Sequence, residues 1–156
     1  MPSRSKSARP LSLAFVMDPV EKEPISASTT IVLMREAQDR GHEVLYVDPA
    51  DLCVDNGHVR AEAAPIKLDL ASETPVRRGP VRSVDFDGEI HVAFQRKDPP
   101  VDRDYIVATQ ILDVCQKTLV LNRPSSVISF NEKLLAVRFA DLMPPTRVTR
   151  HIRELL

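Results

Sequence analysis

The residues best suited to chemistry form the run Arg96-Lys97-Asp98-Pro99-Pro100, in which two cations, a carboxylate and two prolines follow a strand-like stretch. Each proline fixes its own φ at about −65° and restricts the residue before it to extended geometry, so this loop is stiff. In open α/β sheets, ligands bind in the crevice at the carboxyl ends of the strands. A stiff cationic loop at that place suits a carboxylate or a polyanion. The alternative is a surface turn whose charges are only solvated.

The glycines exclude the common nucleotide-binding loops. A dinucleotide-binding fingerprint needs three glycines within six residues, and a P-loop needs Gly-Lys followed by Ser or Thr. The chain contains four glycines, and none of them lies in such a pattern: Gly41, Gly57, Gly79 and Gly88. The sequence therefore argues against a nicotinamide-dependent oxidoreductase and against a P-loop hydrolase.

The sequence predicts no metal site. The four histidines are not at metal-ligand spacing. Cys53 and Cys115 lie far apart without a CxxC motif, so we expect both to be buried and the protein to be in a reducing, cytoplasmic compartment. The carboxylates of Asp85 and Asp87 are close in sequence, but we expect them on a solvated surface.

Length and charge limit the classes of protein. At 156 residues the chain is long enough for one domain with a substantial core and short for two. A formal net charge of −1, from 21 basic and 22 acidic residues, argues against a nucleic-acid-binding or membrane-surface role. Residues 1–10 carry basic residues but no apolar run typical of a signal peptide, so we expect a disordered basic tail. An organellar-targeting segment is the alternative for this stretch.

The elements that position the charged loop begin with a parallel β-α-β unit. Residues 11–17 and 43–47 are apolar runs that each end just before an Asp-Pro pair, which predicts two buried strands. Between them, Ser26 or Ser28 can cap a helix that ends before Gly41. A right-handed crossover is expected to join the two strands.

The middle of the chain predicts an insertion and two further strands. Asp55-Asn56-Gly57 between strand-like runs is a strong hairpin signal, so an antiparallel ribbon should follow the second parallel strand. Residues 90–94 and 118–121 predict two more strands, separated by an amphipathic helix at residues 102–117. The fold class is therefore α/β, with a Rossmann-like, mostly parallel sheet flanked by helices and an inserted antiparallel hairpin.

The last part of the chain predicts one more helix. Ser129 and Glu132 have the spacing of a capping box, in which Ser129 is the N-cap of a helix that continues to Leu142. Lys133 then lies in the first turn of that helix. Such a position is suited to an anion, because a helix N-terminus and an ammonium group attract negative charge together.

Three segments in this order resemble one family, the bacterial glutathione synthetases. They are Phe15-Val16-Met17-Asp18-Pro19, the charged loop at residues 96–100, and Asn131-Glu132-Lys133-Leu134. The resemblance is to the N-terminal pre-ATP-grasp domain and the first elements beyond it, and it covers nearly the whole chain after the tail. The charged loop is its most specific motif, whereas the last segment is shared more widely among ATP-grasp ligases.

The resemblance implies an activity, cofactors and partners. Members of this family join γ-glutamylcysteine to glycine in glutathione biosynthesis, through an acyl phosphate that the glycine amine attacks. They use ATP and magnesium. The family is also expected to be cytoplasmic and homo-oligomeric, with no nucleic-acid or membrane partner.

The resemblance also implies roles for particular residues. Asp18 and the three charged residues Arg96, Lys97 and Asp98 would face one cleft and bind the peptide substrate. Arg96 is suited to pair with a carboxylate through two hydrogen bonds, and Asp98 would hold the two cations in place. Lys133 would approach the ATP phosphates, and its alternative is a solvated first-turn lysine. No residue is assigned a catalytic or metal-binding role.

By this resemblance, residues 1–10 are the tail, residues 11–124 are the pre-ATP-grasp domain, and residues 125–156 are only the start of the ATP-grasp region. The glycine-rich lid, adenine pocket and acidic magnesium ligands of that region are not in the sequence. Because phosphoryl transfer depends on such positioning groups, we expect the chain alone to be inactive and to bind neither ATP nor Mg²⁺ tightly.

Two hypotheses follow. The chain is the substrate-side lobe of a glutathione synthetase, truncated or working with a separate ATP-grasp lobe, or it is a non-catalytic binding or assembly module of the same fold. One local departure is Gln95, where the family usually has an apolar residue, and it predicts a side chain at the sheet edge.

Overall fold

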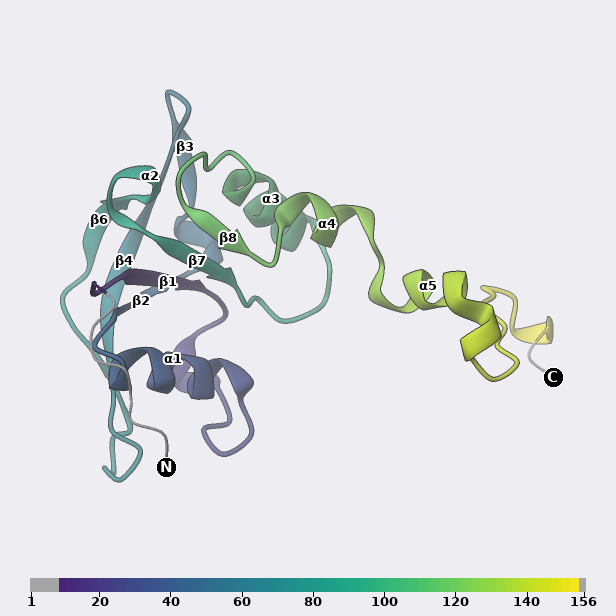
Figure 1. The fold of residues 1–156 in the computed structure, drawn as a ribbon, viewed down its shortest axis with the longest axis horizontal. Helices are drawn as coiled ribbons and strands as arrows, with labels where there is room; N and C mark the ends of the chain where they lie inside the picture. Colours follow the sequence, from purple (N-terminus) through teal and green to yellow (C-terminus); the bar gives the residue numbers. More distant parts are fainter. Residues whose placement is uncertain (1–8, 155–156) are drawn as a thin grey trace.

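The structure, a computed structural model, describes residues 9–154, in which eight strands form a sheet with helices on both faces (Figure 1). The predicted basic tail falls mostly on residues 1–8, outside the described residues. The strands are β1 (Ser12–Val16), β2 (Glu43–Val47), β3 (Cys53–Asp55), β4 (His58–Leu68), β5 (Val76–Arg78), β6 (Arg82–Asp85), β7 (Val92–Gln95) and β8 (Leu119–Leu121).

The helices of the described part of the chain are short, and none is long and apolar enough to cross a membrane. The α-helices are α1 (Thr29–Asp39), α2 (Phe86–Glu89), α3 (Arg103–Leu112), α4 (Pro124–Ser129) and α5 (Glu132–Ala136). The 3-10 helices are η1 (Val20–Lys22), η2 (Pro49–Asp51), η3 (Val137–Leu142) and η4 (Ile152–Glu154).

Four parallel strands form the half of the sheet that carries the charged loop. Their order is β2-β1-β7-β8, with β1 paired to both β2 and β7. Beyond β2 the long strand β4 runs antiparallel, and it pairs also with β3, β5 and β6. The predicted α/β class with an inserted antiparallel ribbon is confirmed. The ribbon is larger than the sequence indicated, because β5 and β6 join it.

The turn of the β3–β4 hairpin has the predicted chemistry. Asn56 and Gly57 have φ values of 49° and 85°, in the left-handed region that a two-residue type I′ turn requires at both positions.

Strand β1 is buried on both faces, which fixes where its carboxyl end lies. Leu13 and Phe15 belong to the core on the α1 side, whereas Ala14 and Val16 belong to the core on the α3 side. Figure 1 shows α1 on one side of β1 and β2, and α3 with α4 on the other. Burial of each large side chain contributes about 1.5–3 kcal/mol, so the central strands form a rigid base for the loops that follow them.

Helix α1 is bounded by the predicted residues and held toward β4. The Ser28 hydroxyl accepts a hydrogen bond from the N–H of Ile31 at 3.3 Å, and Gly41 follows the helix at a φ of 83°. The side-chain amide of Gln38 donates to one β4 carbonyl at 2.6 Å and accepts from a β4 N–H at 3.1 Å. These two hydrogen bonds hold α1 against β4.

Helix α2 was not predicted, and it carries a structural carboxylate. Asp87 accepts hydrogen bonds from the backbone N–H groups of residues 116, 117 and 118, at distances of 2.8 to 3.1 Å. These bonds fix the turn between α3 and β8. The expectation that Asp87 lies on a merely solvated surface is therefore wrong.

The two cysteines lie in different surroundings. Cys53 is exposed on β3, so the expectation that it is buried is wrong. Cys115 is partly buried, and burial, followed by the nearby charge of Asp87, raises the pKa of its thiol to about 12. The Cys115 thiol is therefore protonated at neutral pH.

The capping-box prediction is wrong, because Ser129 ends helix α4 and does not begin the next helix, α5. Ser129 is the last residue of α4, and Phe130 has extended geometry (φ −117°, ψ 106°) that interrupts the helix. Asn131 is the N-cap of α5, where its side chain accepts from the N–H groups of Lys133 and Leu134. Lys133 is in the first helical turn, as predicted.

Residues 130–154 form what we call the C-terminal arm. Figure 1 shows α5 and the chain after it extending away from the sheet. Apart from Glu132, whose side chain is not described, every residue of the arm is exposed or only partly buried. A five-residue α-helix followed by 3-10 turns has little stability of its own.

Gln95 is buried and not at the sheet edge as predicted. It lies on β7 beside Val16 of β1, and the residue is 5% exposed. Its side-chain nitrogen donates to the hydroxyl of Thr109, which donates in turn to the carbonyl of Tyr105 at 2.7 Å. The side-chain oxygen of Gln95 has no hydrogen-bond partner among the described residues.

Replacing Asp87 by Asn should lower the free energy of unfolding by about 1–3 kcal/mol at neutral pH, because a charged acceptor is lost. Burial raises the pKa of Asp87, but the three N–H groups outweigh it and hold the pKa below its ordinary value. The stabilisation is therefore fully present above the unfolded-state pKa of about 3.9 and disappears as the pH falls through the folded-state pKa. Urea unfolding at neutral pH and at about pH 3 measures this loss.

The matched control is Asp113→Asn, at the exposed C-cap of α3, which should change the unfolding free energy by less than about 0.5 kcal/mol. A difference between wild type and Asp87→Asn that stays the same at both pH values would show that the charge of Asp87 does not matter.

Gln95→Met should raise the midpoint of thermal unfolding and increase stability by about 1 kcal/mol, because it removes a buried oxygen without a partner. Thr109 keeps its bond to Tyr105 in this variant. Calorimetry measures the midpoint of thermal unfolding for this variant and for the control Gln110→Met, which makes the same change at an exposed position on α3. A lower midpoint for Gln95→Met would contradict the assignment of an unsatisfied oxygen.

Candidate functional site

The carboxyl ends of β1 and β7 meet where the helix connections diverge. From β1 the chain crosses to β2 through α1 on one face, and from β7 it crosses to β8 through α3 on the other. Such a switch point opens a crevice beyond the strand ends, where ligands bind in open α/β sheets. The loops that follow β1 and β7 lie together at this point, as expected from the sequence.

Asp18 joins these two loops through both of its carboxylate oxygens. Oδ1 accepts a hydrogen bond from Lys97 Nζ at 3.1 Å, and Oδ2 accepts from the backbone N–H of Asp98 at 2.9 Å. The carboxylate that holds Lys97 is thus Asp18, and Asp98 contributes its backbone. The role predicted for the Asp98 carboxylate is corrected accordingly.

Arg96 and Lys97 diverge onto opposite faces of the sheet. The guanidinium of Arg96 donates to the hydroxyls of Thr30 and Thr29, through Nε at 2.9 Å and Nη2 at 2.8 Å. These threonines begin α1, so Arg96 fastens β7 to that helix. Lys97 points to the α3 side, because it lines a pocket with residues of α3. The family resemblance implied that the two cations face one cleft, but of the two only Lys97 lines the described pocket.

This pocket has a volume of about 390 Å³ and lies between the ends of β1 and β2 and helix α3. Its charged lining consists of one ammonium group and three carboxylates, from Lys97, Asp18, Asp48 and Asp104. Its apolar lining comes from Pro19, Pro49, Ala50, Leu52, Val107, Ala108 and Ile111. A polyanion would be repelled by three carboxylates, whereas a ligand that carries both charge signs matches this lining.

The Asp18–Lys97 pair is ionised at neutral pH. Burial is the largest influence on Asp18 and raises its pKa, but the hydrogen bonds from Asp98 and Lys97 outweigh burial and leave the pKa low. The bond to Asp18 raises the pKa of Lys97 against the opposing effect of burial, and the charges of Asp18, Asp102 and Asp104 raise it further. Groups that stay charged bind and orient a ligand and are poor proton-transfer groups at neutral pH.

Sequence reasoning missed Asp48 and Asp104 as pocket residues. Asp48 precedes Pro49 after β2, which is the same pattern as Asp18 and Pro19 after β1. That repeated Asp-Pro pair at two neighbouring strand ends was a usable signal. Asp104 had no comparable signal, because acidic residues are common in the first turn of any helix.

The side of the pocket formed by Asp48 is supported by a buried aromatic residue. The Tyr46 hydroxyl donates to Asp48 at 3.3 Å, and the guanidinium of Arg78 lies 4.0 Å from the Tyr46 ring centre. Burial, then the Asp48 charge, raises the pKa of Tyr46 to about 12. Arg78 also pairs with Glu21 of η1 at 2.9 Å, so β5 secures the loop after β1.

Lys133 is not brought to this pocket. Its backbone N–H donates to the Asn131 side chain at 3.0 Å at the start of α5. Figure 1 shows α5 on the arm, away from the ends of β1 and β7. Approach of Lys133 to a nucleotide stays a prediction.

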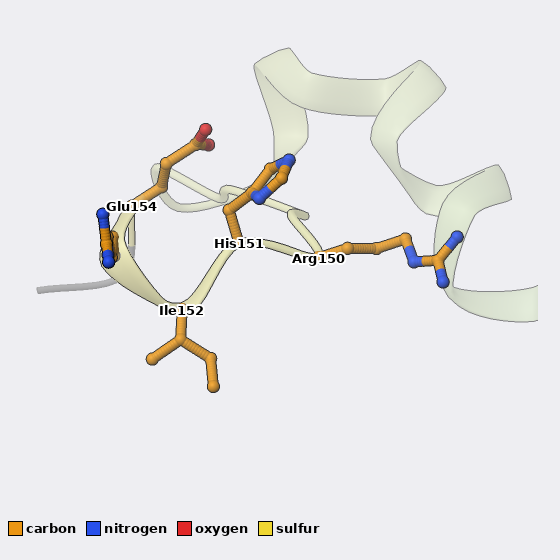
Figure 2. A pocket seen from close by; sticks show the side chains of 5 residues that line it. Arg150, His151, Ile152 and Glu154 are labelled. Atoms are coloured by element: carbon orange, nitrogen blue, oxygen red, sulfur yellow. The ribbon is translucent and has the colours of Figure 1, made fainter.

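A larger hollow of about 540 Å³ lies beside η4, but its side chains do not form a site (Figure 2). Figure 2 shows Ile152 pointing away from His151, and Arg150 pointing away from Glu154. All five lining residues are exposed. Because the polar groups diverge and stay hydrated, this hollow has no chemistry comparable to the Lys97 pocket.

The comparisons with known proteins agree on one family. A family model of the prokaryotic glutathione synthetase N-terminal domain matches residues 11–127. Glutathione synthetases of Salmonella typhimurium and Xanthomonas campestris are 36% and 37% identical over 147 residues, and that of Escherichia coli O127:H6 is 34% identical over 154 residues. Each alignment covers 93% of this chain and 46% of the relative, so the chain spans about half the length of the curated relatives it matches.

Replacing Lys97 by Met should raise the pKa of Asp18, because a hydrogen bond and an opposite charge are lost while burial stays. The stability contributed by the Asp18 carboxylate is fully present above its unfolded-state pKa and is lost as the pH falls through its lowered folded-state pKa. The contribution is at most about 1 kcal/mol, since Asp18 is partly exposed. Carbon-detected NMR titration of the Asp18 carboxyl measures its pKa in both proteins. An unchanged pKa would contradict the observed pairing.

Proposed function

Because this chain belongs to the family of the prokaryotic glutathione synthetase N-terminal domain, we propose that it is the substrate-side part of a glutathione synthetase, the ligase that joins γ-glutamylcysteine to glycine. The single observation that carries this role is the ionised Asp18–Lys97 pair in a pocket at the switch point of the sheet. A volume of about 390 Å³ suits a small molecule of dipeptide size.

The mixed charge of the pocket suits the γ-glutamyl end of the substrate. That end carries an α-ammonium and an α-carboxylate on the same carbon. In our proposal Lys97 binds the carboxylate, while the carboxylates of Asp18, Asp48 and Asp104 attract the ammonium. Val107 and Ile111 would contact the methylene groups.

Arg96 and Asp98 have supporting places in this proposal. Arg96 positions the start of α1 through Thr29 and Thr30, on the face of the sheet opposite the Lys97 pocket. Asp98 holds the loop through its backbone N–H. In our proposal both residues support the loop that carries Lys97 and take no part in proton transfer.

The ATP-dependent step requires groups outside this pocket. Among the described residues no cluster of three or more His, Cys, Asp or Glu side chains could hold a metal ion, so we assign no Mg²⁺ site to them. In a complete enzyme ATP supplies the phosphoryl group that activates the carboxylate. We propose that ATP and Mg²⁺ bind mainly to a separate ATP-grasp lobe, and that Lys133 lies where that lobe meets this chain. We also propose that the protein is located in the cytoplasm.

A second candidate is a non-catalytic binding or assembly module of the same fold. The arm favours it, because its exposed side chains can bind another protein. The two candidates differ in whether the Lys97 pocket binds the peptide substrate.

An ADP-release assay with ATP, Mg²⁺, γ-glutamylcysteine and glycine tests the proposal. It is run on this chain, on the second half of the Salmonella typhimurium relative, and on their mixture. We expect activity in the mixture alone, and calorimetry should detect γ-glutamylcysteine bound to this chain. No activity and no binding would refute the substrate role and leave the assembly module.

In that mixture, Lys97→Gln should lower kcat/KM for γ-glutamylcysteine about ten- to a hundredfold, because a charge-assisted hydrogen bond to the substrate carboxylate is lost. Lys67→Gln, an exposed position on β4, is the matched control and should leave kcat/KM unchanged. Equal activity of the two variants would place the substrate elsewhere.

A further inference from the structure

Two of the three carboxylates that line the Lys97 pocket already accept hydrogen bonds through both of their oxygens. Asp18 accepts from Lys97 Nζ at 3.1 Å and from a backbone N–H at 2.9 Å. Asp48 accepts from the backbone N–H of Ala50 at 2.9 Å and from the Tyr46 hydroxyl at 3.3 Å. These bonds fix the orientation of each carboxylate and use one acceptor site on each oxygen.

The third carboxylate, Asp104, has its acceptor sites unused. Within residues 9–154, its side chain has neither a hydrogen bond nor an ion pair. Asp104 lies in the first turn of α3, and it lines the pocket together with Val107, Ala108 and Ile111, which follow it at i+3, i+4 and i+7. One side of α3 therefore offers the pocket an apolar surface with a free carboxylate at its end.

Lys97 has unused donors close to this carboxylate. An ammonium group carries three N–H groups, and among the described residues only Asp18 accepts from one of them. The bond to Asp18 is the largest influence that raises the pKa of Lys97, and the charge of Asp104 raises it too. Asp104 is therefore near enough to act on Lys97 through its charge, although the two side chains form no ion pair.

An α-amino acid group needs such a neighbouring pair, because its ammonium and its carboxylate are on the same carbon. If Lys97 binds the carboxylate, the group that binds the ammonium must lie near Lys97. Asp18 is near, but its charge is already balanced by Lys97. Asp102 also acts on Lys97, but its carboxylate caps α3 by accepting from the N–H of Tyr105 at 2.9 Å, and it does not line the pocket. Asp104 is the carboxylate that meets both conditions.

We propose that Asp104 is the specificity-determining residue of the Lys97 pocket, where its carboxylate binds the α-ammonium of a γ-glutamyl compound while Lys97 binds the α-carboxylate. This assignment rests on the proposed function. It makes the pocket selective for ligands with a free α-amino group. An analogue without that group, glutarylcysteine, fills the same volume but leaves the Asp104 carboxylate without its partner.

Isothermal titration calorimetry of the full chain with these two ligands tests the assignment. We expect wild type to bind γ-glutamylcysteine about tenfold more tightly than glutarylcysteine, because one charge-assisted hydrogen bond is lost. Asp104→Asn should lower the affinity for γ-glutamylcysteine alone, so that the two ligands bind nearly equally. Asp104→Glu keeps the charge and should keep the preference. Because Asp104 is exposed, the circular dichroism spectra of both variants should match that of wild type.

Two further variants serve as controls for Asp104. Asp113→Asn removes an exposed carboxylate at the other end of α3 and should leave both affinities unchanged. Asp48→Asn alters a carboxylate of the same pocket and should change both affinities by the same factor, which leaves the preference intact.

The outcomes separate this assignment from the proposed function. If wild type binds γ-glutamylcysteine and the preference survives Asp104→Asn, the assignment is overturned and the proposed function stands. A preference that disappears only in Asp48→Asn would place the ammonium at Asp48 and would also overturn it. Failure of the wild-type chain to bind γ-glutamylcysteine would overturn both.

Discussion

One carboxylate determines how the loops around the Lys97 pocket are joined. Asp18 follows the central strand β1 and accepts hydrogen bonds from both the side chain of Lys97 and the backbone of Asp98. A backbone hydrogen bond from Arg96 to Val16, at 2.8 Å, also joins the ends of β7 and β1. The position of Lys97 in the pocket, and the separation of Lys97 from Arg96, both follow from the contacts of Asp18.

The sequence predicts the central half of the fold well because local signals and burial agree there. Residues 43–47 read as a strand, and Ser28 and Gly41 mark the ends of α1 where the structure places them. The family resemblance implied that the loops of Asp18 and Lys97 face one cleft, and the structure joins these loops by a hydrogen bond. The prediction failed at Ser129, because Phe130 has an extended backbone that ends the helix there, although the sequence has the spacing of a capping box.

Other features depend on contacts between distant parts of the chain. Asp87 looks like an ordinary surface acid until the fold brings residues 116–118 to it. Gln95 looks like an edge residue, but β1 and α3 bury it. Asp104 joins the pocket only because α3 packs beside the strand ends. Neither periodicity nor residue type carries such long-range information.

The central place of β1 has a consequence for the order of folding. Its Ser12 side chain bonds to Glu43 of β2, 31 residues away, whereas the Ser12 backbone bonds to His91 beside β7, 79 residues away. Closing the longer loop costs roughly 0.8 kcal/mol more in chain entropy, so β1, α1 and β2 should assemble before β7 docks. During synthesis on the ribosome, the first half of the domain can therefore become compact while the Lys97 pocket is still incomplete.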